Sequence, residues 1–126
     1  MASKLYDVAY LLVPVTDLER AVRFYRDGLG LDLLWYEARQ GHAAVRTSAA
    51  PLVLRAGGAP NPAGSGPIIA FEVEDIQAAV PALEQQGVTF PEGIERHGGR
   101  LTARFADPDG NPLELNQTLP PPTVTG

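Results

Sequence analysis

Residues 105–117 hold the side chain with the clearest capacity for chemistry, the carboxylate of Glu114. Leu113 and Leu115 flank it, and in an alternating strand both leucines turn to one face while Glu114 and Asn116 turn to the other. On that second face a carboxylate either meets water or forms the floor of a pocket, where it accepts hydrogen bonds from a ligand or acts as a base. The residues of this stretch leave both alternatives open.

Other reactive side chains are few. The chain has no cysteine, which excludes a disulfide framework, a thiolate nucleophile and a cysteine-based zinc site. His42 and His97 stand near glycines at turns or strand starts, as exposed or structural histidines do, and their role stays open. Trp35 and Tyr36 are neighbours on an expected strand, so one points inward; Trp35 either packs in the core or forms a stacking wall for a planar ligand.

An arginine and a glycine-containing segment complete the candidates. Arg104 alternates with Phe105 and is expected on the pocket side, where it is either a solvated surface residue or a group that fixes an anion. Residues 95–100, Glu-Arg-His-Gly-Gly-Arg, are expected to form a mobile loop over the mouth of the pocket, either a lid or only a loop.

The first half of the chain predicts one helix and four strands. Residues 5–15 form a strand with one fully apolar face and one mixed face that includes the phenol of Tyr10, and Asp17 then caps a helix that continues to residue 27. Gly28 and Gly30 end this helix. Residues 31–37, 42–47 and 52–55 are the next three strands.

The second half predicts the same order of elements. Residues 69–73 form a strand, Asp75 caps a helix that Gly87 ends, and Pro81 is expected to weaken or kink this helix. Residues 88–90, 100–106 and 113–116 are the remaining strands, the last two joined by a turn of Asp-Pro-Asp-Gly-Asn at residues 107–111.

An internal repeat supports this division. Residues 15–22 and 73–80 share Val, Asp, an aliphatic residue, Ala and Val at a constant offset. A half with one helix and one sheet leaves the second face of the sheet uncovered, so the two halves are expected to pair around a shared interior. We predict a single domain over residues 1–126, made of one module at about 5–55, a Gly/Pro-rich linker at 56–67, a second module at about 68–117 and a flexible Pro-rich tail at 118–126.

Composition narrows the function classes. Hydrophobic residues make up 44% of the chain and charged residues 20%, typical of a globular protein rather than a disordered one. The net charge of −5 and the lack of a basic cluster argue against nucleic acid as a partner. No apolar run approaches the length of a membrane span or a signal peptide, so no membrane partner is expected and the cytoplasm is the expected location.

Three segments resemble one known family. Residues 13–31, residues 71–75 (Phe-Glu-Val-Glu-Asp) and residues 105–115 are similar to the vicinal oxygen chelate superfamily, which includes glyoxalases, bleomycin-resistance proteins, fosfomycin-resistance enzymes and extradiol dioxygenases. The resemblance covers nearly the whole chain up to Gln117. It implies an α+β fold of two tandem βαβββ modules whose curved mixed sheets enclose a pocket.

The resemblance also implies where a metal would be held. Family enzymes take ligands from the first and last strand of each half, and the matching positions here are Tyr10, Val53, Ile68 and Glu114. A phenol, two hydrocarbon side chains and one carboxylate do not supply the three or more donors that a divalent ion needs. We therefore expect neither a metal nor another cofactor.

The function that follows is binding of a small organic molecule in a metal-independent pocket, of the sequestration or resistance type. The alternative is a lyase, isomerase or dioxygenase that uses Glu114 as a base or as ligand of a non-standard metal site, and whether any reaction is catalysed stays open. A homodimer is expected, with its modules paired within or swapped between chains. Glu114 is the candidate catalytic residue, and the expected ligand-binding residues are Tyr10, Trp35, Val53, Ile68, Arg104, Glu114 and Asn116.

Overall fold

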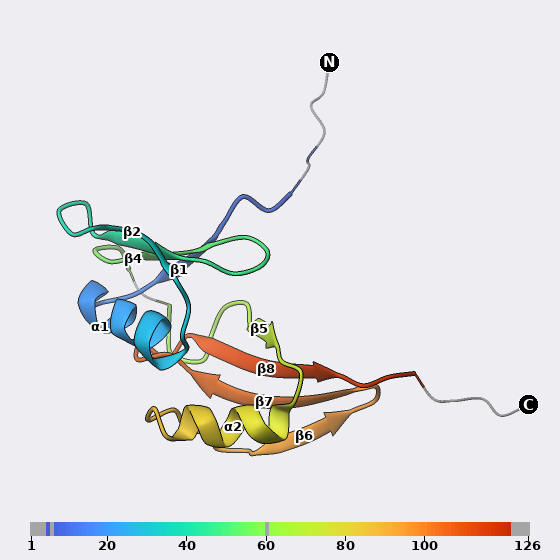
Figure 1. Cartoon of the computed structure of the whole chain (residues 1–126). Coiled ribbons are helices and arrows are strands. Elements are labelled where there is room, and N and C mark those ends of the chain that lie inside the picture. Colours follow the sequence, from blue (N-terminus) through green and yellow to red (C-terminus); the bar gives the residue numbers. More distant parts are fainter. Residues whose placement is uncertain (1–4, 6, 60, 122–126) are drawn as a thin grey trace, which may run out of the picture. The chain divides into compact units, whose positions relative to one another are not determined.

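The computed structural model describes Leu5, residues 7–59 and residues 61–121. It divides into two compact units that meet in sequence between residues 60 and 61 (Figure 1). Each unit has one four-stranded mixed sheet and the order strand, helix, three strands, which confirms the expected α+β fold of two tandem βαβββ modules. Three parts of the predicted elements lie outside the described residues: Tyr6 of the first strand, Pro60 of the linker, and residues 122–126 of the tail.

The first unit begins with strand β1 (Leu11–Pro14) and helix α1 (Leu18–Val22), which continues as one wider, π-helical segment η1 (Arg23–Gly28). Strands β2 (Leu33–Glu37), β3 (His42–Val45) and β4 (Leu52–Arg55) follow. The sheet has the order β1-β4-β3-β2, with β1 parallel to β4 and the other pairs antiparallel. The carboxylate of Asp17 caps α1 by accepting the Arg20 N–H, as the sequence predicted.

The core of the first unit forms where α1 packs on β3 and β4. Alternation along the strands sends one set of apolar residues to this helix-covered face of the sheet. The fully or almost fully buried side chains there are Val13, Val15, Ala21, Val22, Tyr25, Ala43, Val45, Leu52 and Leu54.

Strand β1 is shorter than predicted. The sequence pattern placed a strand over residues 5–15, but ladder pairing is confined to Leu11–Pro14. The partner strand β4 is only four residues long, so there is no further backbone on that side for residues 7–10 to pair with. Val8 and Tyr10 in this segment are exposed.

The second unit repeats the plan with longer strands. Strand β5 (Ile69–Glu72) leads to helix α2 (Ile76–Glu84), and strands β6 (Ile94–His97), β7 (Arg100–Ala106) and β8 (Pro112–Thr118) follow. The sheet order is β5-β8-β7-β6, with β5 parallel to β8. Buried residues of its core are Ile76, Val80, Val88, Phe90, Ala103, Phe105, Leu113 and Leu115.

Helix α2 is capped from two directions. Asp75 accepts the N–H of Gln77, and Gln117 of β8 accepts the N–H of Ile76 at 2.9 Å. The second bond fixes the start of α2 to the face of β8 that carries Leu113 and Leu115. Pro81, which we expected to weaken or kink this helix, lies inside it, and the helix continues past it to Glu84. None of the helices in the described residues is long and apolar enough to cross a membrane.

The segment we predicted as a loop over the pocket is instead a hairpin. Residues 94–97 form β6, which pairs antiparallel with β7 across a two-residue turn of Gly98 and Gly99. Gly98 has a φ of 58°, which glycine adopts without strain and which tight hairpin turns require. The prediction of a strand at residues 88–90 is also wrong. Val88 and Phe90 are buried but do not lie in a strand. The Phe90 ring packs against that of Phe105, with the ring centroids 5.3 Å apart.

The turn between β7 and β8 is held by one carboxylate. Asp107 accepts the N–H groups of Asp109 and Asn111 at 2.9 Å each, and its other oxygen accepts the Asn111 side-chain amide at 2.8 Å. Asp107 and Asn111 are both buried. The predicted Asp-Pro-Asp-Gly-Asn turn is thus present, and its polar groups bond to one another.

Ala63 and Gly64 of the Gly/Pro-rich segment contact this turn. The N–H of Gly64 donates to the carbonyl of Gly110 at 2.8 Å. Gly110 has a φ of 83°, and a Cβ at this position would lie 2.7 Å from the Cβ of Ala63 and 3.0 Å from its Cα. The turn therefore needs glycine both for its backbone angle and for the close approach of residue 63.

We predict that Gly110→Ala lowers the free energy of unfolding by about 1–3 kcal/mol, the cost of forcing a side chain into a left-handed conformation, with the Ala63 contact adding to it. Gly28→Ala is the matched control, because Gly28 lies at the end of η1, has no positive φ, and a Cβ added there would meet no atom within 4 Å. Urea unfolding of both variants measures the difference. Equal stability of the two variants would contradict this account of the turn.

Candidate functional site

Each unit carries candidate residues on the face of its own sheet opposite its own helix, which we call the helix-free face of that unit. In the second unit Leu113 and Leu115 face α2, so Glu114 and Asn116 lie on the helix-free face of β8. The register puts Arg104 of β7 directly opposite Glu114. The other polar residues in register on this face are Glu72, Glu95, His97, Arg100, Thr102 and Thr118.

Glu114 is buried and lies between two cations. Only 6% of the residue is exposed. Its two carboxylate oxygens lie 3.7 Å from Nη1 of Arg100 and 3.9 Å from Nε of Arg104. These distances are ion pairs without hydrogen bonds, since a charged hydrogen bond between nitrogen and oxygen is about 2.7–2.9 Å long. The negative charge of Glu114 is therefore balanced inside its own sheet.

Asn116 is held in a fixed orientation by its neighbours. Its Nδ2 donates to Glu72 at 2.7 Å and to the Thr118 hydroxyl at 3.3 Å. A flipped amide would place its oxygen against the Glu72 carboxylate, so this orientation is the favourable one. The Oδ1 atom of Asn116 is then buried with no hydrogen-bond partner among the described residues.

Glu72 itself is well bonded. The backbone N–H of Thr118 donates to it at 2.9 Å and the Thr118 hydroxyl lies 3.2 Å away. The Thr118 N–H, followed by the Asn116 amide, lowers the pKa of the Glu72 carboxyl, because these donors favour its charged form. Strand β5 ends at Glu72 while β8 continues to Thr118, so the Glu72 side chain accepts the backbone N–H of β8 that has no partner on β5.

The helix-free face of the first unit is apolar and aromatic. Leu12, Val53, Ala44 and Trp35 follow one another across the strands by register. The indole Nε1 of Trp35 donates to Nδ1 of His42 at 3.0 Å, and Nε2 of His42 lies 3.0 Å from Oε1 of Gln40. Because Nδ1 accepts, Nε2 carries the hydrogen and donates to Gln40.

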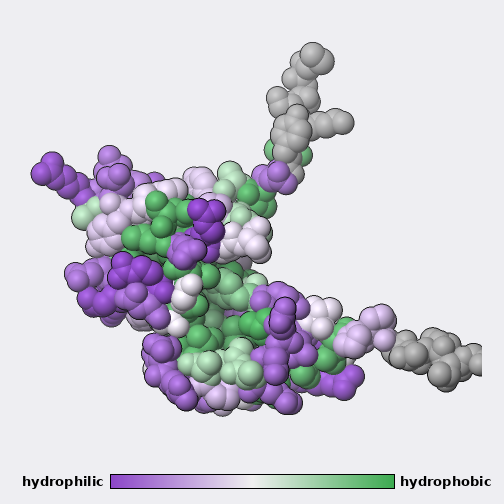
Figure 2. Space-filling view, viewed as in Figure 1, coloured by the Kyte–Doolittle hydropathy of each residue, from purple (hydrophilic) through white to green (hydrophobic). Residues whose placement is uncertain are grey.

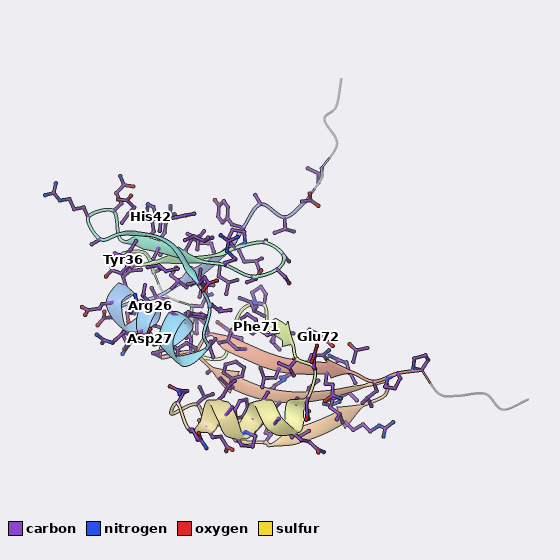
Figure 3. All side chains as sticks on the ribbon, viewed as in Figure 1. Arg26, Asp27, Tyr36, His42, Phe71 and Glu72 are labelled. Atoms are coloured by element: carbon purple, nitrogen blue, oxygen red, sulfur yellow. The ribbon has the colours of Figure 1, made fainter. Side chains whose placement is uncertain are left out.

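Trp35 is not a core residue. It is 40% exposed, and the chain of bonds through His42 to Gln40 fixes the plane of its ring. Tyr36 is also 40% exposed but pairs with Ala43, on the helix-covered side of the sheet. Figure 3 labels Tyr36 and His42 on the β2–β3 hairpin, and Figure 2 shows apolar surface on the visible face of each unit.

The other predicted site residues lie just outside the strands. Tyr10 directly precedes β1 and is 55% exposed, so its phenol is not buried. Ile68 directly precedes β5 and is 39% exposed. Val53 lies in the middle of β4 and is buried.

Sequence reasoning missed two residues. Arg100 was not considered, although it alternates with Thr102 and Arg104 on one strand, the spacing that puts all three on one face. His42 was expected to be exposed or merely structural, and it is the hydrogen-bond partner that orients Trp35. The sequence did contain a sign of the His42 contact, since a short turn at residues 38–41 places residues 35 and 42 close together across a hairpin.

The residues at the family's metal positions do not fit a metal. They offer one phenol, two hydrocarbon side chains and one carboxylate, and that carboxylate already faces two guanidinium groups, which repel another cation. Within residues 7–59 and 61–121, and Leu5, no three His, Cys, Asp or Glu side chains are grouped so that they could hold a metal ion.

The fold, the repeat and the positions on the strands define a class. The chain belongs to the glyoxalase/bleomycin resistance protein/dioxygenase superfamily, whose family model matches residues 7–115. The resemblance found in the sequence is thereby confirmed.

Individual relatives make the similarity more specific. The chain is 27% identical over 120 residues to the protein YraH of Bacillus subtilis (strain 168), a match that covers 83% of this chain and 93% of YraH. The structure of TnmS3, an antibiotic binding protein from Streptomyces sp. CB03234, is similar with a TM-score of 0.79 and 30% identity, covering 93% of this chain and 99% of TnmS3. A glyoxalase/bleomycin resistance protein/dioxygenase from Nocardioides, with a TM-score of 0.80, 22% identity and coverage of 99% of this chain and 93% of its own, shares the fold.

The Glu72 contacts predict a pH dependence of stability. Folding lowers the pKa of Glu72 below its ordinary value of 4.5, so its charged form stabilises the folded state above that value. This stabilisation is lost as the pH falls below 4.5 through the folded pKa. We expect the difference in unfolding free energy between the wild type and Glu72→Gln to shrink over that acidic range, as measured by urea unfolding at several pH values.

Glu74→Gln serves as the control for this experiment, because Glu74 is an exposed carboxylate two residues further along the chain. At neutral pH the free energy of unfolding of Glu74→Gln should lie closer to that of the wild type than that of Glu72→Gln does. A Glu72→Gln difference that does not change with pH would mean that the Thr118 and Asn116 bonds do not hold in solution.

Proposed function

We propose that the protein binds a small, planar organic molecule without a metal. Each unit offers candidate binding side chains on its own helix-free face. The observation that carries the proposal is the ion pairing of Glu114. The one acidic side chain at the family's metal positions is engaged by Arg100 and Arg104, so it is unsuited to bind a cation. Binding of an organic molecule needs no such cation.

Trp35 supports the proposal as a stacking surface. A ring that is 40% exposed and held in one plane by His42 offers a rigid aromatic face at little cost in conformational entropy. Leu12, Val53 and Ala44 extend the same face with hydrocarbon surface. Pockets for organic ligands are mainly apolar and aromatic, with a few polar groups that set orientation.

In the second unit, Asn116 offers a polar group on the helix-free face. An amide oxygen that is buried without a partner costs free energy, which a donor from a ligand or a water molecule would recover. We propose that Asn116 Oδ1 accepts a hydrogen bond from the ligand. Tyr10 and Ile68, both partly exposed, are proposed to contact the ligand as well.

The similarity to TnmS3 agrees with a binding role, because that protein is an antibiotic binding protein. A lyase, isomerase or dioxygenase is the alternative within the family. It would need either a metal or a carboxylate free to reach a substrate, and both oxygens of Glu114 face arginine. We therefore favour binding.

We predict that 2-naphthamide, a neutral planar probe, binds the chelator-treated protein and that added Zn²⁺, Mn²⁺ or Ni²⁺ changes the Kd by less than about twofold. Trp35→Leu should weaken binding by about three- to tenfold, the value of one aromatic contact. The matched control is Tyr36→Leu, since Tyr36 is equally exposed but lies on the other side of the sheet. Isothermal titration calorimetry measures all these constants.

A requirement for metal, or equal losses for Trp35→Leu and Tyr36→Leu, would contradict the proposed site. Binding that appears only with one metal would instead favour the enzymatic alternative. A thermal melt of each variant separates loss of contact from loss of fold.

We also propose that the protein is a homodimer. Val8 and Leu11 leave apolar surface exposed near the start of the chain, where residues 7–10 are not paired in a strand. Burying such surface against a second copy is favourable. Light scattering should give twice the mass of 13.4 kDa at micromolar concentration, and a monomer mass would contradict the proposal.

A further inference from the structure

We infer that the ligand carries an acidic group, of the carboxylate class, and that Arg104 and Arg100 bind it. This inference rests on the proposed function and adds the chemical class of the ligand. It starts from a local excess of charge. Two guanidinium groups lie within 4 Å of a single carboxylate, so the cluster of Arg100, Arg104 and Glu114 has one positive charge that its own members do not balance.

The hydrogen-bonding capacity of the two arginines is also unused. Each guanidinium has five N–H donors, and among the described residues the contacts of both are the ion pairs with Glu114 at 3.7 and 3.9 Å. Elsewhere in the chain arginines do pair at hydrogen-bond distance: Arg26 with Asp27 at 2.8 Å and Arg23 with Glu19 at 3.0 Å. The N–H donors of Arg100 and Arg104 thus lie near the Glu114 carboxylate and are available to a ligand.

Both guanidinium groups are accessible. The side chains of Arg100 and Arg104 are 53% and 56% exposed, whereas that of Glu114 is 8% exposed. A ligand therefore meets the cations before it meets the carboxylate. A planar carboxylate matches the fork of an arginine and accepts two parallel hydrogen bonds from it.

The remaining charges on this face have other positions. Glu72 is already bonded to Asn116 and Thr118, so it is not free to pair with either arginine. Glu95 and His97 lie on β6, where they pair with Thr102 and Arg100. Arg104 is paired with Glu114 of β8. It has no partner on β6, because the pairing of β6 with β7 ends at Ala103. Arg104 is therefore the main binding group, and Arg100 the second.

The experiment uses three probes with one ring system: 2-naphthoate, 2-naphthamide and 2-naphthylmethylammonium, titrated by calorimetry at neutral pH and low salt. We expect 2-naphthoate to bind about tenfold or more tightly than the amide, the gain of one charge-assisted contact, and the ammonium to bind most weakly. Raising the salt concentration should reduce this preference, because both guanidinium groups are exposed.

Arg104→Gln should bring 2-naphthoate and 2-naphthamide to within about threefold of each other, and Arg100→Gln should narrow the gap less. Arg96→Gln is the matched control: it removes the same charge from the same sheet, but Arg96 pairs with Leu101 and so lies on the helix-covered face. If Arg104→Gln unfolds because Glu114 loses a partner, the double variant Arg104→Gln/Glu114→Gln leaves a neutral pair and should show the same loss of preference.

The outcomes separate this inference from the proposed function. If the acid and the amide bind equally and both depend on Trp35, the inference is overturned and the proposed function stands. If the ammonium binds most tightly and Glu114→Gln abolishes that preference, Glu114 contacts the ligand directly and the inference is overturned. If none of the probes binds the folded protein, both the inference and the proposed function fall.

Discussion

The carboxylate of Asp107 fixes the register on which the candidate site of the second unit depends. By accepting two backbone N–H groups and the Asn111 amide, it sets the length of the turn between β7 and β8. That length puts Arg104 opposite Glu114. Because side chains alternate, a slip of one residue would turn Glu114 into the apolar core beside α2 and bring Leu113 or Leu115 to the other face. The bond from Ile76 to Gln117 reinforces the same register from the helix.

Burying a carboxylate in such a sheet is costly unless a charge or a hydrogen bond compensates it. Here the compensation comes from two arginines on the same face of one strand, whose long side chains converge on Glu114. Both pairs are longer than hydrogen bonds and more than half exposed on the arginine side, so each contributes little to stability. The two arginines thus reduce the cost of burying the Glu114 charge, while their own side chains stay more than half exposed.

The sequence was sufficient for the features that local chemistry decides. The capping aspartates at 17 and 75, the turn at 107–111 and the alternation of Leu113, Glu114 and Leu115 each follow from a few neighbouring residues, and the repeat then indicated the two modules. The sequence was insufficient where the structure of a segment depends on the strand with which it pairs. The length of β1 depends on β4, and residues 94–97 form a strand because Gly98 and Gly99 return the chain onto β7. The pairing of Arg100 with Glu114 also depends on a register that the sequence does not display.

The chemistry of Glu114 connects these points to function. The charge of a carboxylate at a metal position can be balanced by a bound metal ion, which several donors share, or by cationic side chains of the protein itself. These two arrangements exclude each other, because a metal ion and two guanidinium groups repel. In this chain the second solution is in place, since Arg100 and Arg104 approach both oxygens while Tyr10, Val53 and Ile68 offer no set of anionic donors. At Glu114 two guanidinium groups of the chain therefore take the place that a metal ion would have beside this carboxylate.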